Sequence, residues 1–343
     1  MINYNFLDPA VVENPYPFFS ELVERAPVYQ VPGTDVYLVS SHKLVDAALR
    51  NNNDFSANLT GVLVTNTDGH PELFDFTQFG GAVDAIANAD EPAHSVHRKL
   101  LLPQLNARKV EAMEDELRDW SAQRIQKLVD AGQGDWMDEV ANRVPVMAMI
   151  RLAGLPMEDL EQLMQWAFAG GEILAGTTTL DKMIELSVHT AAMSTYLIKH
   201  FSKALETNGT EQPTDVIGEL VIGVREGLIS EKEAISIMVV LVGAAGESTS
   251  SLTGNAVRML AENSELQAIL RQQPEKIENF IEETVRLETP FKGHYRVVIN
   301  DTRLGDTDLP EGSWVILMWA AANRDPSVFE DPNSLNINRI RPR

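Results

Sequence analysis

A carboxyl group and two hydroxyl groups lie in the middle of a long apolar segment. Glu247, Ser248 and Thr249 interrupt a run that is otherwise rich in Ile, Met, Val and Leu. A buried carboxylate is costly unless it is paired or neutralised, and a hydroxyl inside a helix can bond back to the carbonyl four residues earlier. The small residues Ala244 and Ala245 would let a ligand approach the helix. Two interpretations stay open: a polar kink that packs against neighbours, or the wall of a ligand site.

Two pairs of charged residues have helical spacing. His94 and Arg98 are four residues apart, so they share one helical face, and both can donate hydrogen bonds to an anion. Glu283 and Arg286 are three residues apart and can pair with each other. A solvated surface pair remains an alternative in both cases, because such pairs usually contribute little to stability. A further cation, Arg296, lies far along the chain from His94.

The elements that must position these groups are mostly helices. A 3.6-residue period of apolar residues runs through most of residues 91–289, and the stretch 230–262 predicts the longest helix, which should cross the core. Strand-like patterns occur at about 27–40 and 295–320, where Gly- and Pro-containing turns separate short apolar runs. No linker or repeat divides the sequence. We therefore predict one domain over residues 1–343, mainly α with a small β part.

Two further segments carry local predictions. Residues 107–131 have an apolar stripe that predicts one long helix. Residues 56–90 are rich in Gly, Asn and Thr, with scattered aromatic residues, and we interpret them as a long loop with one short helix. Loops of this length inside a compact chain are usually functional or mobile.

The composition excludes several classes of protein. Of 343 residues, 44% are hydrophobic and 23% are charged, which is typical of a globular protein. The formal net charge of −22 argues against binding to nucleic acids or to anionic membrane surfaces. The sequence has no cysteine, so as it stands it offers no disulfide and no thiolate ligand. The N-terminus has no secretory signal pattern, and we expect a soluble cytoplasmic protein.

Together these motifs resemble those of the cytochromes P450, and in particular the soluble bacterial heme-thiolate monooxygenases. Five segments carry the resemblance: residues 90–98, 247–255, 283–286, 290–296 and 321–326. In that order, they are similar to the family's propionate-binding helix, its distal-helix signature, its Glu-x-x-Arg motif, a further propionate-binding arginine, and the segment before its meander. The joint match is far more specific than any single motif.

The resemblance implies a heme cofactor held between a distal helix and a proximal loop. Ala244 and Ala245 would leave room over the iron, and Glu247, Ser248 and Thr249 would be the catalytic residues that deliver protons to dioxygen. Ser248 stands where the family usually has Thr, so the hydroxyl is kept and the methyl is lost.

The resemblance also assigns roles to the charged groups. His94, Arg98 and Arg296 would neutralise the heme propionates, whereas Glu283 and Arg286 would be structural. Counting along the meander places the family's additional arginine at Ser334, so we expect the Glu–Arg network to lack its third member.

The implied function is hydroxylation of a mainly apolar small molecule with dioxygen and electrons from a ferredoxin-type donor. The substrate-binding stretches would be about 56–90 and 155–205, which carry apolar residues and few charges. A basic strip could receive the acidic electron donor, although a solvated basic surface is an equal alternative. The strip consists of Arg98, Lys99, Arg108 and Lys109.

The family's Cys-containing loop, Phe-Gly-x-Gly-x-x-x-Cys-x-Gly, would follow Arg343, and the sequence does not include it. The axial thiolate is therefore missing, and we expect a P450-like fold that is C-terminally incomplete. Three interpretations are open. The sequence is part of a normal monooxygenase, which the retained heme-directed residues favour; or the protein is a naturally heme-less auxiliary partner of an enzyme such as a glycosyltransferase; or the old substrate pocket serves redox-free chemistry.

Overall fold

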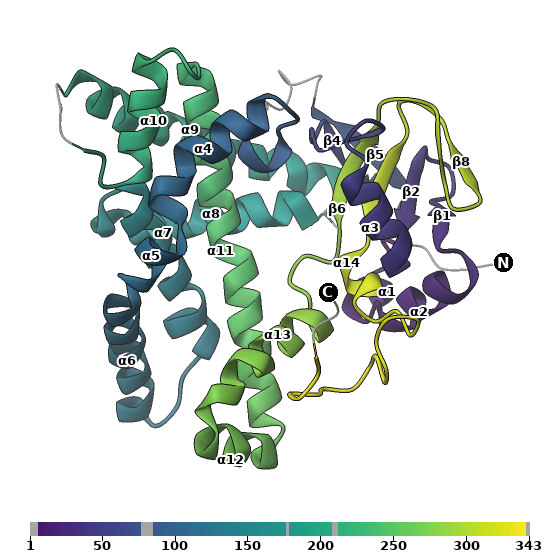
Figure 1. Ribbon diagram of the computed structural model, residues 1–343. Helices are drawn as coiled ribbons and strands as arrows, with labels where there is room; N and C mark the ends of the chain where they lie inside the picture. Colours follow the sequence, from purple (N-terminus) through teal and green to yellow (C-terminus); the bar gives the residue numbers. More distant parts are fainter. Residues whose placement is uncertain (1–5, 77–84, 176–177, 208–211, 341–343) are drawn as a thin grey trace. The chain divides into compact units, whose positions relative to one another are not determined.

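The structure, a computed structural model, describes residues 6–76, 85–175, 178–207 and 212–340 (Figure 1). The chain divides into two compact units, each assembled from segments that are separated in the sequence. Unit 1 comprises residues 1–81, 175–180 and 251–343, and unit 2 comprises residues 82–174 and 181–250. The mainly α class with a small β part is confirmed, whereas a single domain over the whole chain stays a prediction.

Unit 1 holds the strands of the described chain together with short helices. Its strands are β1 (Val28–Gln30), β2 (Val36–Val39), β3 (Phe55–Ser56), β4 (Gly61–Thr65), β5 (Pro71–Asp75), β6 (His294–Val298), β7 (Thr302–Leu304), β8 (Thr307–Leu309) and β9 (Trp314–Leu317). Its helices are α1 (Pro9–Glu13), α2 (Tyr16–Arg25), α3 (His42–Arg50), α12 (Ser264–Gln272), the 3₁₀ turn η5 (Pro274–Lys276), α13 (Ile277–Leu287) and α14 (Trp319–Ala322).

A five-stranded sheet with the order β1-β2-β9-β6-β3 organises unit 1. The predicted hairpin between β1 and β2 is present, and Gly33 in its turn has a φ of 78°, a conformation that glycine adopts without steric cost. Strand β2 pairs in parallel with β9, and β9 pairs antiparallel with β6. The two ends of the sequence thus build one sheet, and its core includes the fully buried Val39, Val298 and Leu317.

A second hairpin corrects the predicted loop at 56–90. Strands β4 and β5 pair antiparallel, with Val62 opposite Phe74 and Val64 opposite Glu72. The turn between them contains Gly69, which has a φ of 81°. Because the residues around the turn are polar, the sequence analysis did not identify these two short strands. Residues 77–84 of the predicted loop lie outside the described residues.

Unit 2 is helical throughout its described residues. Its elements are η2 (Ile86–Asn88), α4 (Ala93–Leu105), α5 (Ala107–Glu111), α6 (Glu114–Ala131), the π-helical turn η3 (Met137–Ala141), α7 (Arg143–Ala153), η4 (Met157–Asp159), α8 (Leu160–Ala175), α9 (Leu180–Glu206) and α10 (Val216–Arg225). The long helix α11 (Glu231–Ala261) contributes its first part to unit 2 and its end to unit 1.

The predicted helix over residues 107–131 is divided into α5 and α6. The division falls at Ala112 and Met113, directly before three acidic residues in the first turn of α6. Acidic side chains stabilise a helix N-terminus, so this sequence favours a new helix start where the apolar stripe predicted continuity.

Helix α11 passes through the core of unit 2, as predicted. By length and composition alone it is a candidate membrane span, with a mean hydropathy of 1.5 over its most apolar window, but core helices of soluble proteins meet the same criterion. In unit 2 it buries Ala234, Ile237, Met238 and Val242 in one cluster with residues of α7 to α10. These four residues place one side of α11 in the core of unit 2.

One buried hydrogen bond joins the β4–β5 hairpin to the large sheet. The amide of Leu63 donates to the Tyr295 hydroxyl at 3.0 Å. Tyr295→Phe leaves this buried amide without its acceptor, and we expect a loss of about 1–3 kcal/mol in the free energy of unfolding. Urea unfolding measures it. Tyr29→Phe, on the partly exposed strand β1, is the matched control, and equal effects of the two changes would contradict the assignment.

Candidate functional site

Helix α11 places the predicted catalytic residues at consecutive positions, one turn after the two alanines. The Ser248 hydroxyl donates to the carbonyl of Ala244 at 3.3 Å, as expected for a serine inside a helix. The helix is continuous through this segment, so the polar residues do not end it. Glu247, Thr249 and Ala245 occupy the neighbouring positions of the same turn.

The carboxyl group of Glu247 lies against helix α8. A Cβ atom placed on Gly171 would lie 1.8 Å from Oε2 of Glu247, so only glycine leaves room for the carboxyl in this arrangement. Burial raises the pKa of Glu247, and the negative charge of Glu172 raises it further. Both effects disfavour the charged form of the carboxyl, which favours its role as a proton donor.

Helix α4 carries His94 and Arg98 one turn apart. Nδ1 of His94 lies 3.2 Å from Oε1 of Glu91, and Arg98 is exposed. Hydrogen bonds from Ser95 and His94 lower the pKa of Glu91. His94 and Arg98 therefore lie on one helical face as two possible hydrogen-bond donors, with the carboxylate of Glu91 at the start of that face.

A buried contact, which the sequence did not indicate, anchors α4. The His97 side chain is fully buried, and its Nε2 lies 3.8 Å from Oε1 of Glu233 in the first turn of α11. Glu233 accepts hydrogen bonds from the hydroxyl and the amide of Ser230, which lower its pKa. One face of α4 is thus fixed to α11, which leaves His94 and Arg98 on another.

Arg296 lies on strand β6 of unit 1. Its Nη1 donates to the carbonyl of Tyr295 at 2.7 Å. The sequence analysis did not predict a contact beside Arg296, in which Trp319 donates its indole N–H to Nδ1 of His294. Burial lowers the pKa of the His294 imidazole, and the positive charge of Arg296 lowers it further. Arg296 belongs to unit 1, and His94 and Arg98 belong to unit 2, so neither unit by itself brings the three cations together.

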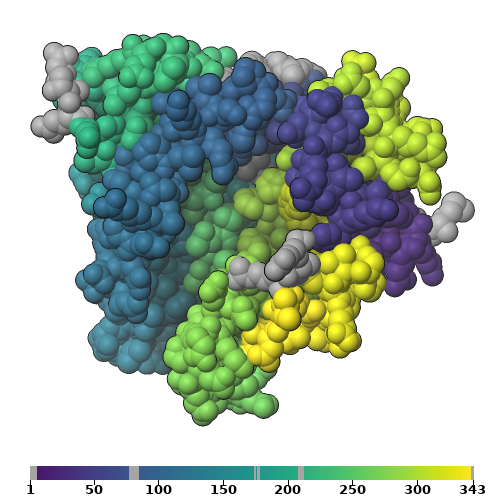
Figure 2. All heavy atoms as spheres, viewed as in Figure 1, coloured from purple at the N-terminus to yellow at the C-terminus, as the bar shows by residue number. Residues whose placement is uncertain are grey.

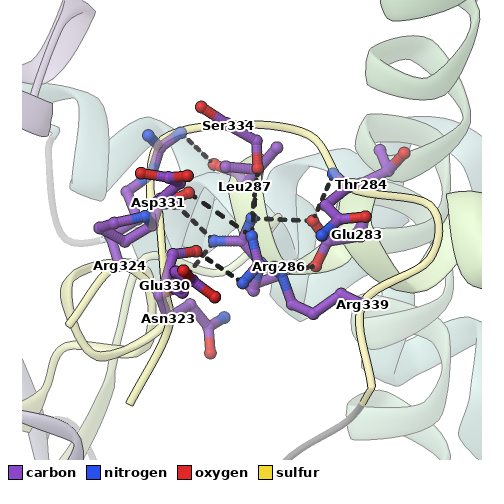
Figure 3. Close-up of polar contacts among 12 residues, drawn as sticks. Glu283, Thr284, Arg286, Leu287, Asn323, Arg324, Glu330, Asp331, Ser334 and Arg339 are labelled. Carbon is purple, nitrogen blue, oxygen red and sulfur yellow. Dashed lines mark hydrogen bonds and ion pairs between the residues drawn. The ribbon is translucent and has the colours of Figure 1, made fainter. Parts of the chain in front are cut away.

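Glu283 and Arg286 form a buried ion pair in unit 1, not a solvated one. Their exposed fractions are 5% and 6%. Arg286 donates from Nε to Oε1 of Glu283 at 2.7 Å and from Nη2 to Oε2 at 2.9 Å. Figure 3 shows Arg286 reaching from α13 into the loop that follows α14, where it donates to the carbonyls of Asn323, Pro332 and Ser334.

The prediction that the network lacks a third member is wrong. Arg339 donates from Nε to Oε1 of Glu283 at 3.0 Å and from Nη1 to the carbonyl of Glu330 at 2.8 Å (Figure 3). Ser334 takes part through its backbone carbonyl only. The count along the sequence failed because the chain turns at Asp331, where φ is 46°, and brings a later residue back to the carboxylate.

The charge of Glu283 is held by its donors. Burial acts to raise its pKa, but Arg286, the amide of Asn336 and Arg339 outweigh burial and lower it. The stability that depends on this carboxylate is therefore fully present above the pKa of an unfolded glutamate. It is lost as the pH falls through the lower pKa of the folded state.

A cavity of about 760 Å³ in unit 1 is separate from all the predicted site residues. It lies between the end of α11, α12 and α13 and is lined mainly by apolar side chains, among them Leu252, Leu260, Leu270, Phe280 and Ile281. It contains no acid and no histidine, so it offers no group for proton transfer. In the described ranges, no three His, Asp or Glu side chains are clustered as a metal site.

Removing either arginine should destabilise unit 1, but unequally. Arg286→Ala leaves the buried Glu283 with a single cation and frees three carbonyls, and we expect a loss of about 3–5 kcal/mol in the free energy of unfolding. Arg339→Ala leaves the bidentate pair in place and should cost less. Chemical unfolding measures both. Arg303→Ala, which removes an exposed pair with Asp308, should have almost no effect.

The same network predicts a pH dependence. Glu283→Gln should flatten the acid limb of a plot of unfolding free energy against pH, because the group with the lowered pKa is gone. An unchanged acid limb would show that other carboxylates carry it.

Comparison with known proteins gives one family. The cytochrome P450 family model matches residues 177–342. Cytochrome P450 144 of Mycobacterium tuberculosis is 36% identical over 97% of this chain and 76% of its own length. A beta-dihydromenaquinone-9 omega-hydroxylase of the same organism is 26% identical over 99% of this chain and 66% of its own length.

A solved structure agrees with these relatives. Mycobacterium smegmatis CYP164A2 in its ligand-free state superposes with a TM-score of 0.81 at 26% identity, and the match covers 98% of this chain and 83% of that one. A relative at 36% identity over nearly the whole chain, together with this agreement in fold, leads to one conclusion: the chain belongs to the cytochrome P450 family.

Proposed function

We propose that this chain, with heme bound, hydroxylates a mainly apolar small molecule with dioxygen and electrons from a ferredoxin-type protein. The observation that carries the proposal is the polar turn of α11, where a half-buried acid and a serine hydroxyl follow two alanines in a helix that buries one side in the core of unit 2. Burial raises the pKa of Glu247, and an acid with a raised pKa can deliver a proton. The neighbouring hydroxyl of Ser248 can relay a proton.

The residues present fit the periphery of a heme. His94 and Arg98 supply donors for a carboxylate from one face of α4 in unit 2, and Arg296 of unit 1 has the second guanidinium that the family resemblance assigns to the propionates. Ala244 and Ala245 add little side-chain bulk on the polar turn of α11. No residue of the printed sequence is assigned as the axial thiolate, because the sequence has no cysteine. Bound heme would supply the activation of dioxygen; the residues named here would hold its propionates and carry protons.

An apolar substrate is supported by the composition of the proposed substrate stretches and by one relative. Residues 155–205 include α8 and much of α9, which bury Leu163, Trp166 and Leu197 among their apolar residues. The name of one relative gives beta-dihydromenaquinone-9 as the molecule that it hydroxylates. The substrate proposed here is therefore a small molecule with a large apolar surface.

A ferredoxin-type donor is supported by the basic strip of unit 2. Arg98, Lys99 and Arg108 are exposed on α4 and α5, and on the same two helices Leu102 and Val110 are 47% and 49% exposed. Figure 2 shows the surfaces of these two helices in blue. Basic side chains around exposed apolar ones suit a transient contact with an acidic protein. We also propose a cytoplasmic location, which the burial of α11 in the core of unit 2 supports.

Heme uptake tests the main proposal. We expect the full-length protein to show a Soret band and the reduced carbon-monoxide difference spectrum of a thiolate-ligated heme. Arg98→Gln and Arg296→Gln should each weaken heme retention about tenfold, because each change removes one charge-assisted contact. A competition assay with apomyoglobin measures this loss.

The matched control is Arg108→Gln, which makes the same change on α5 outside the proposed propionate contacts. It should retain heme like the parent protein. Complete failure of the full-length protein to take up heme would overturn the proposal. A heme-less role as a binding partner, tested by co-purification with a glycosyltransferase, would then replace it.

Charge reversal tests the basic strip. Lys99→Glu and Arg108→Glu should each slow electron transfer from a reduced ferredoxin several-fold and weaken its dependence on salt, because each removes an attractive contact in the encounter. Stopped-flow reduction at several ionic strengths measures both effects. Lys43→Glu, an equal charge change on α3, is the control. Rates that fall equally in all three variants would show a general charge effect and no docking site.

A further inference from the structure

Helices α8 and α11 approach each other closely within unit 2. A Cβ atom on Gly246 would lie 2.8 Å from Cβ of Ala167, and a Cβ atom on Gly170 would lie 3.1 Å from Cα of Gly243. Each of these contacts depends on a residue without a side chain. The backbone of α8 therefore lies directly against the polar turn of α11.

Glu247 sits at the end of this contact. Its Oε2 and Cβ lie 1.8 Å and 2.9 Å from the position of a Cβ atom on Gly171, so its side chain occupies the space that any other residue at 171 would fill. The residue next to Gly171 is Glu172, which is exposed. The geometry thus brings a second, solvated carboxylate to the helix segment that holds the half-buried one.

The surroundings of Glu247 differ from those of Glu283. Glu283 has two arginines and a backbone amide as donors, and its pKa is lowered. Burial and a like charge act on Glu247, and its pKa is raised. Lys182 at the start of α9 donates to Glu185 at 2.8 Å, and this hydrogen bond, with smaller contributions from the charges of Glu185 and Glu172, raises the pKa of Lys182. Lys182 therefore offsets part of the negative charge of Glu172.

We propose that α8 controls proton transfer by Glu247: Gly171 provides the space in which its carboxyl is buried, and Glu172 is a positioning residue whose negative charge adds to the effect of that burial. The inference deepens the proposed function, because it assigns control of the proton donor to a helix outside α11. In the step itself, the O–H bond of Glu247 breaks and its proton passes to a water molecule, which leaves a carboxylate and a hydronium ion. The reverse transfer from a hydronium ion restores the acid.

Infrared titration of the Glu247 carboxyl tests the proposal. The protonated carboxyl absorbs separately from the carboxylate, and subtraction of the Glu247→Gln spectrum assigns its band. We expect Glu172→Gln to shift the titration midpoint to lower pH, Glu172→Lys to shift it further, and Lys182→Gln to shift it to higher pH. Glu161→Gln, the same charge change about 16 Å away along α8, should leave it in place.

Gly171→Ala tests the geometry separately. The added methyl should displace the carboxyl of Glu247 and move its midpoint, while Gly132→Ala, a change at the C-terminus of α6, should not. If Gly171→Ala fails to fold, the Glu172 and Lys182 series decides the question. An unmoved midpoint in both Glu172 variants would overturn the proposal.

The readout needs neither heme nor turnover, so it is independent of the proposed function. A midpoint that moves as expected in a protein without heme uptake would support the α8 inference and reject the oxidative role. Heme uptake with an unmoved midpoint would support the oxidative role and reject the α8 inference. In the heme-loaded full-length protein, the pH profile of hydroxylation should shift in the same direction as the midpoint in each variant, and a merely structural role for Glu172 would not move it.

Discussion

The cost of burying a carboxylate governs the organisation of this protein. Glu283 is almost fully buried in unit 1, and a charge in that position is tolerated only if cations and amides surround it. Its donors come from its own helix and from a loop about fifty residues later in the sequence, so one carboxylate joins α13 to the chain after α14. The loop has no regular secondary structure after α14, and much of its order comes from carbonyls that accept from Arg286 and Arg339.

Glu247 meets the same constraint in the opposite way. No arginine is placed against it among the described contacts; it lies instead on a glycine of α8 beside another acid. The pKa of Glu283 is thus lowered by its donors, and the pKa of Glu247 is raised by burial and by a neighbouring acid. Groups of one chemical type whose surroundings move their pKa values apart are the usual basis for dividing structural from proton-transfer roles.

Much of the fold and part of the candidate site could be predicted from the sequence. The hairpin of β1 and β2, the pairing of Glu283 with Arg286, and the long helix α11 all follow from local spacing, because turn chemistry and helical periodicity act over a few residues. Arg339 could not be placed, since its contact depends on a turn at Asp331 and not on its distance along the sequence. His97, Gly171 and Glu172 were missed for a related reason: each acquires its role from a second helix that only the tertiary structure brings near.

The trio of Glu283, Arg286 and Arg339 also constrains how the sequence can change over generations. Loss of any one member strands a charge or several carbonyls in the interior, so a substitution at one position is harmful until another compensates it. Single substitutions are therefore disfavoured at these three positions, whereas an exposed side chain of the same loop, such as that of Asn338, is free to diverge. In this family we therefore expect the surface residues of the loop to vary while the three charged residues are retained.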